Sequence, residues 1–118
     1  MADDAARSAL LEAAAGAEAL LRSAGAEVES IVDARRDTAT DDEHDPEGAT
    51  LAFERSQADT VRRGAAARLD QIAAALARLD AGTYGRCERC GDEIPSARLE
   101  IRPWATDCVA CATGAVRR

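Results

Sequence analysis

The arrangement of the four cysteines constrains this chain more than any other feature. They form two C-x-x-C pairs, Cys87 with Cys90 and Cys108 with Cys111, and seventeen residues separate the pairs. Two such pairs can deliver four thiolates to one tetrahedral zinc ion, and sulfur suits zinc or an iron–sulfur centre better than it suits hard cations. Gly91 follows the first pair, where a tight turn brings backbone close to sulfur. Because sulfur fills all four positions, the spacing predicts a structural metal.

The same cysteines allow two other uses, namely two disulfides or a dithiol redox motif. The start of the chain, Met1-Ala2-Asp3-Asp4, is acidic and lacks the basic and then apolar pattern of a secretory signal. That favours a reducing compartment, in which paired C-x-x-C motifs indicate metal binding. A redox motif normally uses one pair between a strand and a helix, whereas this chain has two pairs and few expected strands. We therefore expect one structural Zn²⁺, with iron–sulfur, disulfide and redox uses as alternatives.

The composition argues against a thick globular core. The 118 residues suffice for one domain at most, the apolar content is largely alanine, and the only aromatic residues are Phe53, Tyr84 and Trp104. Alanine buries little area, so a thin helical structure held at one end by a metal fits better. No apolar run approaches the roughly 20 residues that span a bilayer. We expect a soluble, cytoplasmic protein without a membrane partner.

The charge distribution excludes several classes of function. The net charge is −7, residues 1–82 carry 17 acids against 9 arginines, and the chain has no lysine. A protein that grips nucleic acid by its phosphates should show a basic stripe, and none is visible. We therefore expect a protein partner and no sequence-specific DNA binding. Because the sequence also lacks a Gly-rich phosphate loop, a G-x-S-x-G motif and an H-E-x-x-H motif, we do not expect an enzyme.

Two stretches have the spacing of coiled-coil helices, with apolar residues at alternating steps of four and three. The first predicts a helix over about Asp4–Thr38 and comprises Leu10, Ala14, Ala17, Leu21, Ala24, Val28 and Ile31. The second predicts a helix from about Thr50 to Ala81 and comprises Ala58, Val61, Ala65, Leu69, Ile72, Leu76 and Leu79. Gly82 follows directly, where a glycine commonly ends a helix.

Residues 39–49 interrupt both patterns and predict the turn between the helices. Pro46 and Gly48 favour a turn, and five acids occupy the seven positions from Asp41 to Glu47. Two helices of similar length should fold back as an antiparallel coiled-coil hairpin, so we expect a monomer, with an extended oligomer as the alternative. The predicted fold is mostly α, with a hairpin over residues 1–82 and an acidic tip at 39–49. A small zinc finger with four cysteine ligands and a short C-terminal helix follows over residues 83–118.

The finger segment closely resembles the DksA/TraR zinc-finger family. The resemblance covers about thirty residues, from Gly82 to Cys111, and it rests on Tyr84-Gly85, both cysteine pairs, Ile94-Pro95, Arg98-Leu99-Glu100 and Arg102-Pro103. The preceding hairpin matches the family in order and length. The resemblance implies a bacterial transcription regulator that binds RNA polymerase and inserts its coiled coil into the secondary channel, with the acidic tip near the active centre.

The resemblance also assigns roles at the tip. Longer relatives carry Asp-x-x-Asp-x-Ala there, whereas this chain reads His44-Asp45-Pro46-Glu47-Gly48-Ala49. Asp45, Glu47 and Ala49 are the implied counterparts, with Asp45 one step out of register. The alternative is a solvated turn whose charge only prevents aggregation. His44 is expected to be a surface residue, because zinc already has four sulfur ligands.

The arginines give only weak evidence about alarmone binding and polymerase contacts. Some relatives bind guanosine tetraphosphate between polymerase and the finger–hairpin junction, which requires a basic cluster. The arginines of the second helix are interrupted by uncharged residues, so we expect weak or absent alarmone dependence. Arg86, Arg98 and Arg102 are expected either to contact polymerase or to pair with nearby acids, and Trp104 to cover the core of the finger. Alternative functions are a zinc-stabilised adaptor for another protein and a thiol or zinc redox sensor.

Overall fold

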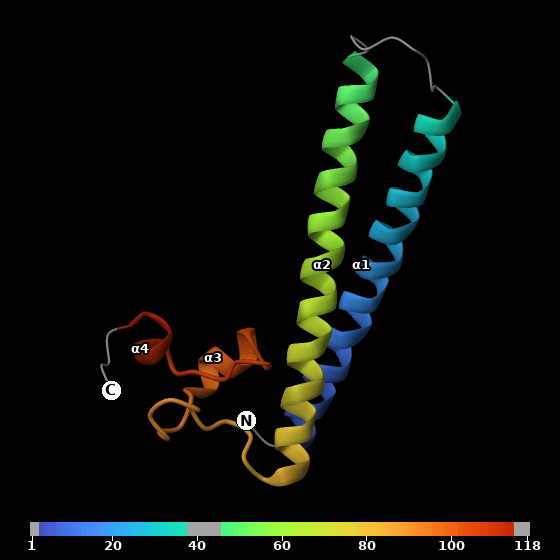
Figure 1. Ribbon diagram of the computed structural model, residues 1–118. Coiled ribbons are helices and arrows are strands. Elements are labelled where there is room, and N and C mark those ends of the chain that lie inside the picture. The colour runs from blue at the N-terminus through green and yellow to red at the C-terminus, as the bar shows by residue number, and fades with distance from the viewer. Residues whose placement is uncertain (1–2, 38–45, 115–118) are drawn as a thin grey trace. The chain divides into compact units, whose positions relative to one another are not determined.

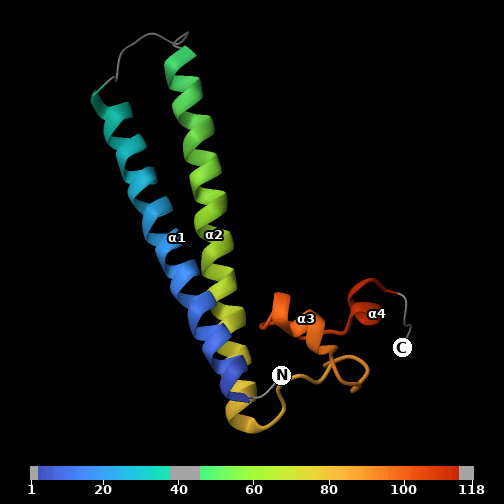
Figure 2. The same cartoon turned by 180° about the vertical axis from the view of Figure 1, so that it is seen from behind.

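The computed structural model describes the backbone of residues 3–37 and 46–114, and the side chains of residues 3–26 and 48–114. Its helices are α1 (Asp3–Asp37), α2 (Pro46–Ala81), α3 (Ser96–Ile101) and α4 (Val109–Ala112). The helices α1 and α2 contain 35 and 36 residues and run antiparallel as a hairpin (Figures 1 and 2). The predicted mostly helical fold is confirmed. Within the described ranges no helix is long and apolar enough to cross a membrane.

Three of the four ends of the long helices agree with the ends predicted from the sequence, and one differs. The start of α1 at Asp3 and its end at Asp37 lie within one residue of the expected ends. However, α2 begins at Pro46, four residues before the expected start and inside the predicted turn. Proline suits the first helical position, because its φ is already helical and the N–H it lacks would have no partner there. The reading of Pro46 and Gly48 as turn residues was therefore wrong.

The end of α2 follows the glycine rule. Gly82 has a φ of +77°, a conformation that costs glycine little. Its N–H donates to the carbonyl of Leu79 at 3.2 Å, and the N–H of Thr83 donates to the carbonyl of Arg78 at 2.9 Å. This pair of bonds is a Schellman motif, which satisfies carbonyls left free at the helix end. The prediction that Gly82 ends the helix is confirmed.

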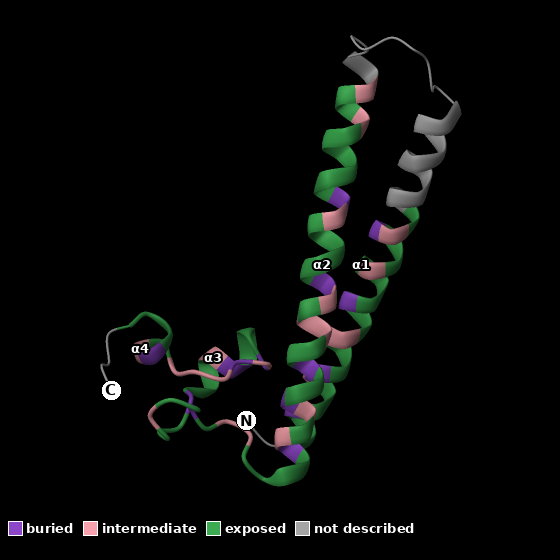
Figure 3. Cartoon of the chain, viewed as in Figure 1, coloured by how far each residue is buried: buried purple, intermediate pink, exposed green. Residues whose placement is uncertain are grey.

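The chain divides into two compact units, Met1–Ala15 with Leu69–Arg118, and Gly16–Arg68. In the first unit, buried residues lie on facing sides of α1 and α2 (Figure 3). We call this group the base cluster, and it consists of Ala6, Leu10, Ile72, Ala75 and Leu79. The largest fully buried side chains among the described residues are Leu10 and Ile72. The expected heptad pattern contained Leu10, Ile72 and Leu79 but missed the two alanines.

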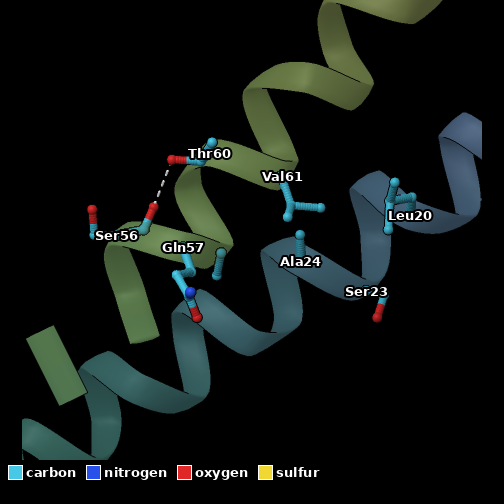
Figure 4. Close-up of a pocket in the computed structure, with 8 residues that line it drawn as sticks. Leu20, Ser23, Ala24, Ser56, Gln57, Thr60 and Val61 are labelled. Atoms are coloured by element: carbon cyan, nitrogen blue, oxygen red, sulfur yellow. Dashed lines mark hydrogen bonds between the residues drawn. The ribbon is translucent and has the colours of Figure 1, made fainter. Parts of the chain in front are cut away.

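The second unit buries only alanines among its described side chains, namely Ala17, Ala24, Ala58 and Ala65. Val61, expected among the buried positions, is 41% exposed, and Leu20 is 49% exposed. Both line a groove of about 550 Å³ between the helices (Figure 4), whose other lining residues are Ser23, Ala24, Ser56, Gln57, Ala58 and Thr60. Val61 lies about 40° around the helix from Ala65. Val61 therefore lies at the groove, whereas Ala65 is buried.

Candidate metal centre

The structure brings the four cysteine sulfurs together. All four Sγ atoms lie within 4.8 Å of one another, and those of Cys90 and Cys108 are 3.8 Å apart. A tetrahedral ion with Zn–S bonds of about 2.3 Å separates its sulfur ligands by about 3.8 Å. The cysteines form no disulfide in the described chain. The donor set and its spacing therefore fit one zinc ion bound by Cys87, Cys90, Cys108 and Cys111.

The first cysteine pair lies in a tight turn. The N–H of Cys87 donates to the carbonyl of Asp92 at 2.8 Å, and the N–H of Gly91 donates to the carbonyl of Cys87 at 2.9 Å. Gly91 has a φ of +78°, as the sequence predicted for a turn close to sulfur. An isolated β-bridge between Arg86 and Glu93 closes the turn. This local backbone points both thiols of the pair toward one centre.

The second pair is held by a short helix. Cys108 precedes α4, and Cys111 lies within it, so the N–H of Ala112 donates to the carbonyl of Cys108 at 2.9 Å. The short helix α4 therefore includes one ligand of the predicted site, and residues 115–118, where the chain continues, lie outside the described residues. The N–H of Glu88 donates to the carbonyl of Thr106 at 2.9 Å, which ties the two cysteine pairs together.

A small apolar core adjoins the sulfurs. It consists of Cys87, Ile94, Leu99, Ala105 and Cys111, all buried. The thiols of Cys90 and Cys108 are partly buried at its edge. With four sulfur ligands and no open position, a zinc ion here acts as a structural cross-link.

The pKa values of the cysteine thiols differ within the cluster. Burial raises the pKa of the Cys87 thiol, but hydrogen bonds from the backbone of Cys108, Cys90 and Arg89 outweigh it and lower the pKa to about 6. For Cys111, burial and then the three neighbouring thiols raise the pKa to about 12. The pKa of Cys90 is also raised: the backbone of Asp92 lowers it, but burial and the bonds to Cys87 and Cys108 outweigh this. Four adjacent thiolates need a divalent cation to offset their repulsion.

Three side chains join the finger to the base of the hairpin within the first unit. The Tyr84 hydroxyl donates to the carbonyl of Pro103 at 2.8 Å. Both Tyr84 and Trp104 pack against the base cluster. An Arg78 guanidinium nitrogen lies 3.5 Å from the carbonyl of Trp104, and another lies 3.8 Å from the carboxylate of Glu88. Trp104 therefore covers the base cluster, not the finger core as the sequence suggested.

The three arginines predicted to contact polymerase have local partners in the described chain. Arg86 donates to the carbonyl of Gly91 at 3.2 Å, and Arg98 donates to the carbonyl of Asp107 at 2.8 Å. The guanidinium of Arg102 lies 5.9 Å from the centre of the Trp104 ring. These contacts are to carbonyls and a ring, while Glu88 pairs with Arg78. In the described chain these three arginines thus contact carbonyls and a ring, and their contact with polymerase stays a prediction.

Sequence reasoning missed a hollow that gathers four arginines. It measures about 490 Å³, and its lining includes Arg78, Arg89, Arg98 and Arg102 together with Trp104, Asp70 and Asp107. The arginines come from α2 and from separate parts of the finger, so no local pattern could indicate that they meet. Asp70 and Asp107 offset part of the charge, and Arg89 lies 3.6 Å from the carboxylate of Asp107.

The tip residues are largely outside the described part of the chain. Asp45 and His44 lie outside the described residues, and so does the side chain of Glu47, whose backbone is in the first turn of α2. Ala49 is exposed on α2. The roles assigned to these residues stay predictions.

Comparison with known proteins points to one family. Residues 82–117 match the prokaryotic dksA/traR C4-type zinc finger. An uncharacterised protein of Aquifex aeolicus is 52% identical over 46 residues, which are 39% of this chain and 32% of that protein. General stress protein 16O of Bacillus subtilis is 39% identical over 64 residues, covering 54% and 39% of the two chains. The RNA polymerase-binding transcription factor DksA of Haemophilus influenzae is 44% identical over 45 residues, which are 38% of this chain and 31% of that protein.

These matches cover between 31% and 39% of the relatives' own lengths. A similarity in structure extends further. The transcription factor DksA2 from Pseudomonas aeruginosa superimposes with a TM-score of 0.77 at 25% identity, over 96% of this chain and 81% of that one. The similarity therefore includes the helices as well as the finger, and the four cysteines form a C4 zinc site of the dksA/traR type.

Proposed function

Because the chain carries the zinc finger of the DksA/TraR family, we propose that it is a transcription regulator that binds RNA polymerase. The observation that carries this proposal is the joint presence of a C4 finger and a long helical hairpin, similar to DksA2 over 96% of the chain. A relative that matches the sequence is named for RNA polymerase binding. The acidic charge supports a protein partner, since a DNA-binding surface would need a basic stripe.

We propose further that the hairpin enters the secondary channel of polymerase. Residues 1–82 carry 17 acids against 9 arginines, and this charge suits a basic channel that admits nucleotides. Asp45 and Glu47, in and next to the turn, would bring carboxylates close to a Mg²⁺-dependent centre and perturb the surroundings of the ion. In this proposal the protein acts as a monomer in the bacterial cytoplasm and catalyses no reaction.

The finger has a supporting role in the proposal. Zinc supplies a structural cross-link between the two cysteine pairs when it is bound. Arg86, Arg98 and Arg102 are proposed to contact polymerase with the donors that their local bonds leave available, since each guanidinium carries five N–H groups. We propose weak or no alarmone dependence, because Asp70 and Asp107 line the hollow that contains the finger arginines.

Affinity purification from native lysate tests the proposal, with polymerase subunits scored by mass spectrometry. We expect the intact protein to retain polymerase and to alter initiation at sensitive promoters in a reconstituted reaction. The double variant Asp45→Ala/Glu47→Ala should still bind polymerase but lose the effect on initiation. Retention of another protein without polymerase subunits would instead support an adaptor. If the double variant regulated normally, the role of the tip carboxylates would be wrong.

A further inference from the structure

The side chain of Arg78 connects α2 to two separate parts of the finger. It is 15% exposed and extends from the last turn of α2. One guanidinium nitrogen lies 3.5 Å from the carbonyl of Trp104, and the other lies 3.8 Å from the carboxylate of Glu88. Glu88 lies within the first cysteine pair, whereas Trp104 precedes the second pair. One side chain therefore contacts the segments that lead to both halves of the metal centre.

We propose that Arg78 is a positioning residue that holds the finger in one orientation against the base of the hairpin. This inference rests on the proposed function, because the orientation matters when finger and helices contact polymerase together. The four metal ligands, by contrast, belong to the finger core or pack at its edge. Zinc thus shapes the finger, and Arg78 with its neighbours fixes where the finger sits.

Two aromatic residues also contribute to the contact between the finger and the base of the hairpin, which we call the joint. The carbonyls of Pro103 and Trp104 are adjacent, and they accept hydrogen bonds from Tyr84 and Arg78 respectively. The rings of Tyr84 and Trp104 also pack against the base cluster. The two hydrogen bonds to consecutive carbonyls and the packing of the two rings restrict rotation about the short linker after Gly82. The inference therefore predicts that a change at Arg78 alters the surroundings of Trp104.

Arginine suits this position better than lysine. Its planar guanidinium can donate to two partners at once in fixed directions, whereas a lysine ammonium is a compact charge on a flexible stem. The Arg78 backbone is also held, since its carbonyl accepts the Thr83 N–H at 2.9 Å in the Schellman motif. A residue in the last turn of α2, with its backbone held, therefore directs a planar guanidinium toward the finger.

The effect on polymerase binding follows from population arithmetic. If polymerase binds only the docked orientation, the apparent affinity falls in proportion to the docked fraction. A variant that leaves about a tenth of the molecules docked should bind about tenfold more weakly. Its zinc content and its helix content should stay the same, because neither depends on the orientation of the finger.

The sequence offers a direct spectroscopic probe, because Trp104 is the only tryptophan. The experiment compares the full-length wild type with Arg78→Ala and Arg78→Lys, each loaded with zinc. Arg7→Ala is the matched control, since it removes the exposed Arg7–Asp80 ion pair of 2.7 Å in the same unit without touching the finger. The measurements are the emission maximum of Trp104, its quenching by acrylamide, zinc content, far-ultraviolet circular dichroism and polymerase affinity.

We expect Arg78→Ala to shift the Trp104 emission to the red, to increase quenching about twofold and to weaken polymerase binding about tenfold. Zinc should stay at one per chain with unchanged helicity. Arg78→Lys should be intermediate, and Arg7→Ala should match the wild type.

Three results would overturn the inference. Unchanged Trp104 emission and quenching in both Arg78 variants would show that the arginine does not hold the joint. Weaker polymerase binding with unchanged fluorescence would make Arg78 a direct contact. Loss of zinc from both Arg78 variants would place its role in the folding of the finger. If the wild type does not bind polymerase, the proposed function fails, and the fluorescence comparison still decides whether Arg78 positions the finger.

Discussion

Replacing Leu10 by alanine should destabilise the hairpin base far more than replacing its neighbour Leu11. Leu10 is fully buried in the base cluster against Ile72 and Ala75, whereas Leu11 is 54% exposed on the same helix. Leu→Ala removes three carbons, worth about 0.8 kcal/mol each when buried, and leaves a cavity that costs more. We therefore expect Leu10→Ala to lower the free energy of unfolding by about 3 kcal/mol. That is a large part of the roughly 5–15 kcal/mol typical of a domain.

Leu11→Ala is a close control, because it has the same chemistry, the same helix and the adjacent position. Its side chain already contacts water, so we expect a change within about 0.5 kcal/mol. The assay is urea unfolding of the zinc-loaded protein, followed by circular dichroism at 222 nm and by Trp104 fluorescence. Because Trp104 packs against the base cluster, both signals should report the loss of stability in Leu10→Ala. If the two variants lost the same free energy of unfolding, the reasoning that this small cluster stabilises the hairpin would be refuted.

Two further predictions concern the finger and the helix end. Zinc affinity should fall as the pH falls, because binding must displace protons from Cys90 and Cys111, whose pKa values are raised, that of Cys111 to about 12. Chelator competition between pH 6 and 8 measures this, and an affinity independent of pH would contradict it. Gly82→Ala should lower the free energy of unfolding by about 1 kcal/mol, because the φ of +77° strains any residue with a Cβ. Thermal unfolding measures this loss, Gly64→Ala is the control within α2, and an equal or higher melting temperature for Gly82→Ala than for the wild type would count against it.

The features that sequence reasoning predicted correctly depend on few neighbouring residues. Cysteine spacing determines the metal site, and Gly82 and Gly91 both adopt the positive φ for which only glycine is well suited. The start of α2 was misjudged because proline both breaks helices and favours their first position. The heptad pattern placed Val61 between the helices, but its side chain lines the groove and is 41% exposed.

The joint around Arg78 was beyond local sequence reasoning for a different reason. Its partners Glu88 and Trp104 lie ten and twenty-six residues further along the chain. Which of the many arginines meets them depends on how the finger packs on α2. No periodicity encodes that packing, because it results from the short linker and from the aromatic contacts of Tyr84 and Trp104 with the base cluster. Sequence reasoning therefore identified the parts but not the contact between them.

The distribution of large buried side chains bears on how variants of this protein should be interpreted. The first unit buries Leu10, Ile72 and Leu79 beside the finger core, whereas the described part of the second unit buries only alanines. Alanine favours the helix but contributes little burial, so the second unit depends more on helix propensity than on packing. Substitutions of exposed residues there should change stability little. Under the proposed function, a loss of regulation in such variants would therefore report a lost contact with polymerase, and not a damaged fold.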